Sequence, residues 1–183
     1  MQVICVLIRN QEVIFDFVEA CFRFGARLAW TQEAVFLEFP VIQNSHSLDC
    51  LFTELEDLAE HFDVQTRIAA AEDAPTALCF AHFGVTQREL LPVEALRYYS
   101  SPFRESVEIS GMIRNLRKDG IRSLQELRSQ LPNAIAAKFG ENAKQAFARW
   151  GSKNGQAWPG FQFLENFALY SMNGEHGVLE SAS

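Results

Sequence analysis

The sequence has no long hydrophobic run and no cysteines at metal-binding spacing. No stretch approaches the roughly 18 apolar residues that a membrane helix needs. The first residues show neither a basic leader nor a small-residue cleavage site, so we expect a cytoplasmic protein with no membrane partner. The cysteines occur singly in apolar segments without CxxC spacing, which indicates reduced, buried thiols at Cys5, Cys21, Cys50 and Cys79.

Common catalytic motifs are missing as well. The chain has no P-loop, no GxSxG nucleophile elbow and no supported Cys/His pair. Its histidines have no close spacing and are expected at the surface or in packing positions: His46, His61, His82 and His176. We therefore expect no bound metal, no cofactor and no catalytic residue.

The chain does contain enough apolar sequence for a proper core. With 183 residues and 48% hydrophobic residues, it can form one domain or two small ones. The net charge is −7, yet residues 97–153 hold eleven lysines and arginines against five acidic residues, a local net charge of +6. The remainder carries −13. A basic module is thus joined to an acidic one, and only the basic part suits a phosphate-bearing partner.

Hydrophobic periodicity predicts an α+β region over residues 1–90 with the order βαββαβ. Short apolar runs indicate strands at 3–8, 27–30, 35–39 and 64–70, and helical spacing indicates helices within 13–22 and 48–62. A further helix is expected from Pro75 to Phe83, opening near Asp73 and closing at Gly84. This order is typical of the ferredoxin-like fold, which hosts many functions and by itself predicts none.

Residues 91–153 are predicted to be all helical and to contain a helix-hairpin-helix. One helix has its apolar face at Ile109, Met112, Ile113 and Leu116, the turn is Asp119-Gly120-Ile121, and Ser123 to Glu126 form a capping box that starts the next helix. Pro132 begins another short helix, and a last helix runs from Asn142 to Trp150.

The hairpin is the candidate site for DNA. Gly120 permits a left-handed backbone, which is expected to leave main-chain N–H groups at the hairpin and the next helix start free for a phosphate. Such contacts would be sequence-independent and weakened by salt. The alternative is an ordinary helical bundle whose glycine only caps a helix. The predicted DNA-binding residues are Arg114, Arg117, Lys118, Gly120, Ile121, Arg122 and Ser123.

Several segments, in the right order, resemble the Y-family (translesion) DNA polymerases, above all their ImuB-like branch. LPVEALRYY (91–99), LRKDGIRSLQEL (116–127) and LPNAIAAKFG (131–140) resemble the thumb of that family. Residues 64–84 are similar to its last palm strand and the helix after it. TQEAVFLEF (31–39) occupies the place of its Ser-x-Asp-Glu-Ala-Phe-Leu-Asp hairpin. The resemblance covers most of residues 1–150 and implies a ferredoxin-like palm followed by a helix-hairpin-helix thumb.

Departures from the family pattern imply an inactive relative. The family's chemistry uses paired divalent metals held by clustered carboxylates. Here the strand at 3–8 has no carboxylate, and Glu33 is the one residue left at a family metal-ligand position, beside Ala34. Glu38 falls on an acidic position that is not a ligand in the family. There is no room for the family's fingers between Ile8 and Arg27, or for its little finger after residue 153.

Residues 154–183 are interpreted as an acidic aromatic tail. It has three glutamates and no lysine or arginine, so it is not expected to grip DNA. Its apolar residues are expected to pack on the body of the protein or on a partner: Trp158, Phe161, Phe163, Leu164 and Phe167.

The resemblance implies a non-catalytic DNA-binding adaptor in DNA repair and translesion synthesis. Its partners would be the DNA backbone, a RecA-like (ImuA-like) protein and an error-prone polymerase. Two alternatives stay open: a protein-interaction module without DNA binding, and an enzyme that uses Glu33 with other carboxylates.

Overall fold

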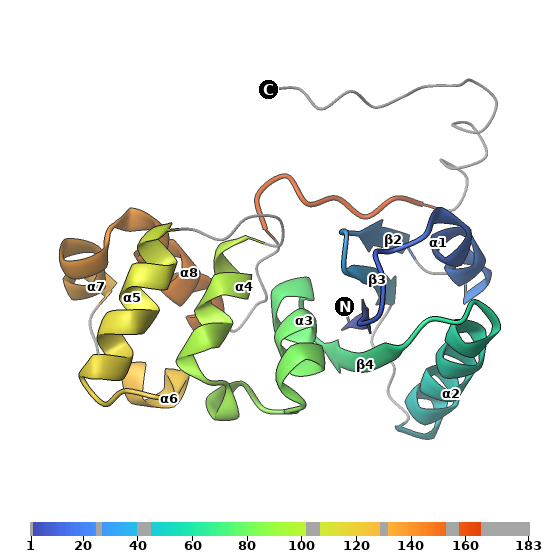
Figure 1. Cartoon of the computed structure of the whole chain (residues 1–183), viewed down its shortest axis with the longest axis horizontal. Coiled ribbons are helices and arrows are strands. Elements are labelled where there is room, and N and C mark those ends of the chain that lie inside the picture. Colours follow the sequence, from blue (N-terminus) through green and yellow to red (C-terminus); the bar gives the residue numbers. More distant parts are fainter. Residues whose placement is uncertain are drawn as a thin grey trace.

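Four strands form one antiparallel sheet with the spatial order β2-β3-β1-β4 (Figure 1). The computed structural model describes residues 2–24, 27–39, 45–101, 107–128, 132–152 and 158–165. Its strands are β1 (Gln2–Ile8), β2 (Arg27–Trp30), β3 (Ala34–Phe39) and β4 (Thr66–Ala71). The predicted order βαββαβ is confirmed. The fourth strand begins two residues later than predicted, because Val64 and Gln65 belong to the connection from the preceding helix.

Helices α1 (Phe15–Cys21) and α2 (Ser45–His61) cover one face of this sheet (Figure 1). A short 3-10 helix, η1 (Phe22–Phe24), follows α1. The apolar stripe of α2 turns inward, with Leu55, Leu58 and Ala59 buried. The sheet side chains beneath these helices alternate along the strands as a pleated sheet requires: Ile4, Val6, Ile8, Leu28, Val35 and Leu37.

Helix α3 (Ala74–Phe83) packs on the opposite face, against β1 and β4. It begins one residue before the predicted Pro75 and ends at the predicted Phe83. Asp73 caps the N-terminus by accepting the N–H of Thr76 at 2.7 Å. Gly84 ends the helix in the left-handed conformation with φ of +66°.

Between residues 88 and 151 the described chain is mainly helical. Two 3-10 turns, η2 (Arg88–Leu90) and η3 (Val93–Ala95), lead into α4 (Leu96–Ser100). The others are α5 (Val107–Lys118), α6 (Leu124–Leu127), α7 (Pro132–Phe139) and α8 (Glu141–Gly151). The helices on either side of Gly120 and Gly140 were predicted. Helix α4 was not, because a five-residue helix is too short to show a periodic apolar pattern.

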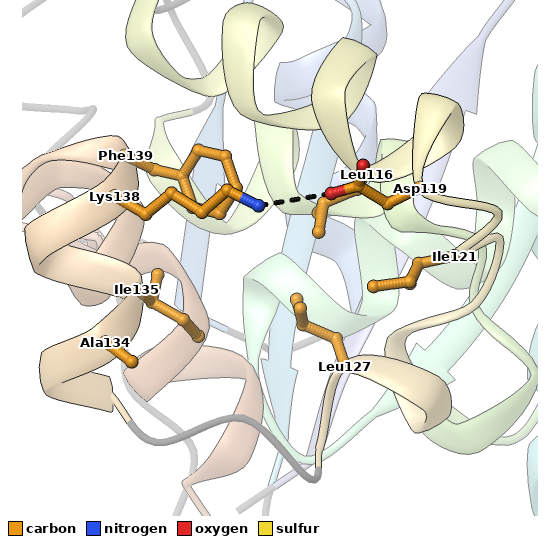
Figure 2. Close-up of a pocket in the computed structure, with 8 residues that line it drawn as sticks. All are labelled: Leu116, Asp119, Ile121, Leu127, Ala134, Ile135, Lys138 and Phe139. Carbon is orange, nitrogen blue, oxygen red and sulfur yellow. Dashed lines mark hydrogen bonds and ion pairs between the residues drawn. The ribbon is translucent and has the colours of Figure 1, made fainter.

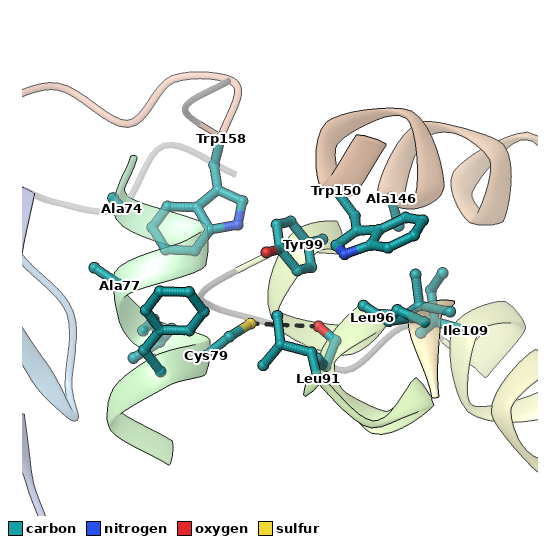
Figure 3. Close-up of a cluster of buried hydrophobic side chains, with 14 of the residues drawn as sticks. Ala74, Ala77, Cys79, Leu91, Leu96, Tyr99, Ile109, Ala146, Trp150 and Trp158 are labelled. Carbon is teal, nitrogen blue, oxygen red and sulfur yellow. Dashed lines mark hydrogen bonds between the residues drawn. The ribbon is translucent and has the colours of Figure 1, made fainter. Parts of the chain in front are cut away.

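We call residues 2–83 the sheet half and residues 88–151 the helical half. One apolar core runs from the sheet into the helical half (Figure 3). It includes Phe36 on β3, Leu78 on α3, Leu96 on α4, Ile109 on α5 and Trp150 on α8. Helix α3 lies between the sheet and the other helices and is buried on both sides, which is why Ala74 to Ala81 are all buried. The division at residue 90 into two domains therefore stays a prediction.

The cysteines are free thiols in the described chain. Cys5, Cys21 and Cys79 are buried, as predicted, and burial raises the pKa of each thiol. The prediction is wrong for Cys50, which is exposed. This residue lies about 140° around α2 from Leu55 and therefore faces away from the sheet. Among the described helices, none is long and apolar enough to cross a membrane.

Candidate nucleic-acid interface

The hairpin between α5 and α6 is built from an amphipathic helix and a tight left-handed turn. Ile109, Met112, Ile113 and Leu116 bury the inner face of α5. Gly120 then adopts φ of +83°, which an L side chain disfavours. Ser123 accepts the N–H of Glu126 at 3.3 Å, and the Glu126 carboxylate accepts backbone N–H groups in return. The predicted turn and capping box are thus confirmed.

The backbone N–H groups of this turn already have acceptors within the chain. Gly120 donates to the carbonyl of Arg117 at 3.1 Å, and Ile121 to that of Leu116 at 2.9 Å. At the start of α6, Leu124 donates to the carbonyl of Leu91 at 2.9 Å. The expectation of N–H groups free for a phosphate is therefore wrong at these positions. The N–H groups of Gly120 and Ile121 close the turn, and that of Leu124 binds the segment between η2 and η3.

The Glu126 carboxylate occupies the place where an anion would sit at this helix start. Its Oε2 accepts the N–H of Arg122 at 2.7 Å and lies 3.5 Å from that of Ser123. These hydrogen bonds, above all the one from Arg122, lower the pKa of Glu126. A nucleic-acid phosphate would have to displace this carboxylate before it could reach the two amides.

The basic side chains of the predicted site nonetheless lie together on an exposed surface. Arg114, Arg117 and Lys118 share one face of α5, because residues three and four apart align on a helix. Arg122 follows in the turn and is also exposed. We call these four residues the basic face. One of them is paired: the Nε of Arg117 lies 2.5 Å from Oε1 of Glu94.

Next to the basic face is a small, largely apolar pocket of about 160 Å³ (Figure 2). Leu116, Ile121 and Leu127 form one side, and Ile135 and Phe139 on α7 form the other. Ile121 of the predicted site therefore packs rather than faces solvent. An ion pair spans the pocket, with Nζ of Lys138 3.1 Å from Oδ2 of Asp119. Both side chains are more than half exposed, so this pair contributes little stability.

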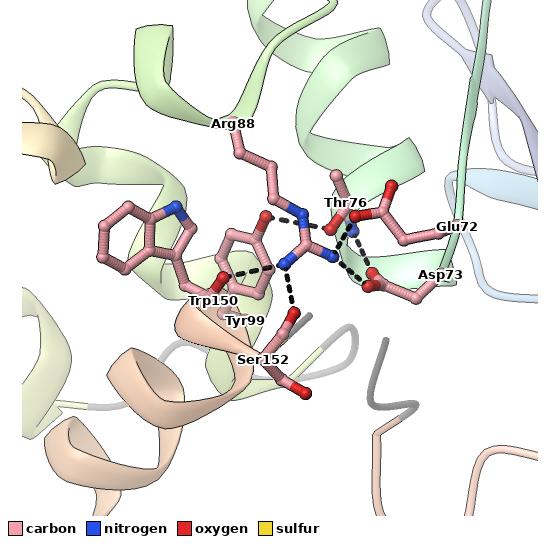
Figure 4. A network of polar contacts seen from close by, with 7 residues as sticks. All are labelled: Glu72, Asp73, Thr76, Arg88, Tyr99, Trp150 and Ser152. Carbon is pink, nitrogen blue, oxygen red and sulfur yellow. Dashed lines mark hydrogen bonds and ion pairs between the residues drawn. The ribbon is translucent and has the colours of Figure 1, made fainter. Parts of the chain in front are cut away.

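Arg88 fixes the helical half against the sheet half (Figure 4). Its Nη1 donates to the carbonyls of Trp150 and Ser152, each at 2.8 Å. Its Nη2 pairs with the carboxylates of Asp73 and, at 2.8 Å, Glu72. The end of α8 is thereby tied to the start of α3. Sequence reasoning missed this residue, because no local pattern shows which distant carbonyls an arginine will meet.

Asp73 is the buried anion of this network. It caps α3 while its other oxygen pairs with Arg88. Burial raises the pKa of Asp73, and the Arg88 charge and the Thr76 hydrogen bonds oppose that effect. A further link joins the two halves, since the hydroxyls of Thr76 and Tyr99 lie 3.0 Å apart.

The end of the two central strands, β1 and β3, where the polymerase resemblance would place metal ligands, is apolar. Leu7 of β1 lies opposite Ala34 of β3, and both side chains are buried. Glu33, beside them in the turn, is 41% exposed, and its Oε1 lies 3.6 Å from Nε2 of His82. His82 in turn stacks on the ring of Tyr98, with centroids 4.3 Å apart. No group of three or more His, Cys, Asp or Glu side chains within the described ranges is arranged to hold a metal ion.

The described part of the tail packs on the sheet and not on the hairpin. Trp158 and Phe161 contact Phe36 edge-on, with centroids 5.7 and 5.3 Å away. Leu164 forms an isolated β-bridge with Leu28, which covers part of the β2 edge. The expected packing on the body is thus confirmed for these residues, whereas Phe167 and the rest of 166–183 lie outside the described residues. In Figure 1 residues 158–165 run beside β2 and α1, away from the turn between α5 and α6.

Comparisons with known proteins add no family. No protein-family model matches the chain, and no curated protein matches it.

Proposed function

We propose that this chain is a non-catalytic relative of the Y-family DNA polymerases, of the ImuB-like kind. In this proposal residues 1–90, the sheet with α1 to α3, are a reduced ferredoxin-like palm, and residues 91–153, with α4 to α8, are a helix-hairpin-helix thumb. The observation that carries it is the buried pair of Leu7 and Ala34, since Ala34 stands where the family pattern has a carboxylate and β1 has none. Glu33 alone cannot hold two divalent ions, and it contacts His82.

The role proposed is that of an adaptor in DNA repair and translesion synthesis. The basic face would contact the DNA backbone weakly and without sequence preference, through side chains rather than backbone amides. The acidic sheet half would recruit proteins, among them a RecA-like (ImuA-like) partner and an error-prone polymerase. The uneven charge supports this division, since +6 is concentrated in residues 97–153 of a chain with net charge −7.

A protein-interaction module without DNA binding is the second candidate. It is favoured by the closed hairpin, in which Glu126 fills the anion position and Arg117 is paired with Glu94. In that case the helix-hairpin-helix is retained only as a scaffold.

Salt dependence of DNA binding separates these two functions. We expect the affinity for primer-template DNA to fall with salt, with a log–log slope of about −0.7 to −0.9 per phosphate contacted. The double variant Lys118→Glu, Arg122→Glu removes two such contacts and should flatten that slope by about 1.4 to 1.8. The control is Arg9→Glu, Arg23→Glu, which makes the same change in charge on exposed positions of the sheet half.

Equal effects of the two double variants, or no binding at low salt, would support the interaction module. A primer-extension assay with magnesium or manganese tests the remaining enzyme hypothesis. Nucleotide incorporation that is lost in Glu33→Ala would overturn the non-catalytic proposal.

A further inference from the structure

An exposed aromatic surface lies at the start of α1, away from the basic face. Among the described residues, four large hydrophobic side chains are exposed, and two of them are neighbours: Ile14 at 36% and Phe15 at 44%. Phe15 meets Trp30 of β2 edge-on, with ring centroids 6.4 Å apart. Trp30 is only half buried and packs with its inner side on the core beneath α1 and α2. Ile14, Phe15 and the exposed part of Trp30 therefore place apolar side chains next to one another at the surface.

Beside this surface is a hollow of about 380 Å³, lined by Glu12, Val13, Trp30, Thr31 and Gln32. Its volume is at the lower end of the range for ligand pockets. The walls are held by main-chain hydrogen bonds, from Val13 to the carbonyl of Gln32 at 2.9 Å and from Thr31 to that of Ala34 at 2.8 Å. The Thr31 hydroxyl accepts the N–H of Ala34 at 3.1 Å. These hydrogen bonds tie together the backbone segments that line the hollow.

The lining combines an indole ring with a carboxylate, which is the chemistry that recognises a guanidinium group. Arginine stacks on aromatic faces and pairs with carboxylates. Glu12 is exposed and makes no ion pair with another residue that the structure describes. Two nearby arginines stack on other rings, Arg23 on Phe24 and Arg27 on Phe163, and not on the indole of Trp30.

We propose that this hollow binds an arginine side chain presented by another protein, with aliphatic neighbours of that arginine resting on Ile14 and Phe15. Charge complementarity favours such a partner over an acidic one. Residues 1–96 carry fifteen acidic side chains against five lysines and arginines, and Asp16, which follows Phe15 at the start of α1, is exposed. The site is independent of the hairpin and of the proposed relation to polymerases.

A peptide titration followed by NMR tests the proposal on the full chain. The probe is acetyl-Leu-Arg-Leu-amide, and the control peptide carries citrulline, a neutral analogue of the same shape, in place of arginine. We expect saturable shifts of the Trp30 indole N–H and of the amides of Val13 and Gln32. The citrulline peptide should bind about fivefold more weakly or worse, because it lacks the charge that both the ring and Glu12 attract.

A substitution at the exposed Glu12 tests the site without disturbing the core. Glu12→Gln should weaken binding of the arginine peptide about two- to fivefold, whereas Glu19→Gln on α1, outside the lining, should change it little. The variant Lys118→Glu, Arg122→Glu should bind the peptide normally even where DNA binding is lost.

Three results would overturn the proposal: equal binding of the citrulline peptide, shifts spread over α5 and α8 instead of the hollow, or equal effects of Glu12→Gln and Glu19→Gln. Self-association of the chain that Glu12→Gln abolishes would also overturn it, because the occupant would then be a second copy.

Discussion

Arg88 holds together parts of the chain that lie far apart in sequence. Its guanidinium group has two carboxylate and two carbonyl acceptors, and its side chain is only 14% exposed. Removing it would leave buried Asp73 without its counter-charge. Loss of one partner of a buried pair is far more costly than the net contribution of that pair.

We predict that Arg88→Met lowers the free energy of unfolding by about 3 to 5 kcal/mol at neutral pH. Urea denaturation followed by tryptophan fluorescence measures it. The loss should shrink as the pH is lowered, because a carboxyl with a raised pKa becomes neutral in the folded state before it does in the unfolded state. Arg88→Lys should recover only part of the loss, since one ammonium group cannot reach the two carbonyls and the two carboxylates at the same time. A loss below about 1 kcal/mol would show that the network is not needed for stability.

Gly111 and Gly120 offer a matched pair of glycine positions. An added Cβ meets nothing within 4 Å at either one, so crowding plays no part. Gly111 lies within α5, whereas Gly120 has φ of +83°. A difference in stability between alanine at position 111 and alanine at position 120 therefore reports backbone conformation alone.

We expect Gly111→Ala to stabilise the protein by about 0.5 to 1 kcal/mol, because alanine favours helix. Gly120→Ala should destabilise it by about 1 to 2 kcal/mol, because the left-handed backbone is unfavourable for an L side chain. Thermal and urea unfolding of the two single variants provide the comparison. The same sign for both would contradict the left-handed turn.

At the scale of an element, the α5–α6 hairpin satisfies its own helix start. Glu126 is exposed, yet its carboxylate accepts hydrogen bonds from the amides of Arg122 and Ser123. Its pKa is lowered, so its stabilising effect is present above the ordinary value of 4.5 and is lost as the pH falls through the lower folded value. Sequence alone predicted the capping box but not that it would exclude a phosphate.

We predict that Glu126→Ala frees these two amides and raises the affinity of the hairpin for DNA more than Glu108→Ala does. The control removes an equal charge from an exposed position at the start of α5. Fluorescence anisotropy at low salt measures both, and carbon-detected NMR titration of the wild-type carboxyl should give a midpoint below 4.5. Equal affinity of the two variants would mean that the amides of this turn take no part in DNA contact.

At the scale of the whole molecule, the shared core makes the two halves depend on one another. Helix α3 contributes to the packing of the sheet and of α4, and Trp158 packs on Phe36 while its indole Nε1 donates to the carbonyl of Tyr98 at 2.6 Å. Neither half can lose its structure without exposing apolar surface of the other.

We therefore predict one cooperative unfolding transition. Midpoints from far-UV circular dichroism and from the fluorescence of Trp150 and Trp158 should coincide in urea, with a single slope. Two separate transitions would instead show that residues 1–90 and 91–153 are independent domains, as the sequence alone predicted.

The strands, most helices, the Gly120 turn and the uneven charge could be predicted from the sequence, because they follow from local periodicity, capping residues and composition. The sequence could not place Arg88 among its four acceptors, bring Glu33 to His82 or lay the tail on the sheet. It also could not show that the hairpin amides are occupied, or that Glu12 and Trp30 line one hollow. These contacts join residues distant in the chain, and their geometry is set by how the sheet, α3 and the helical half pack together.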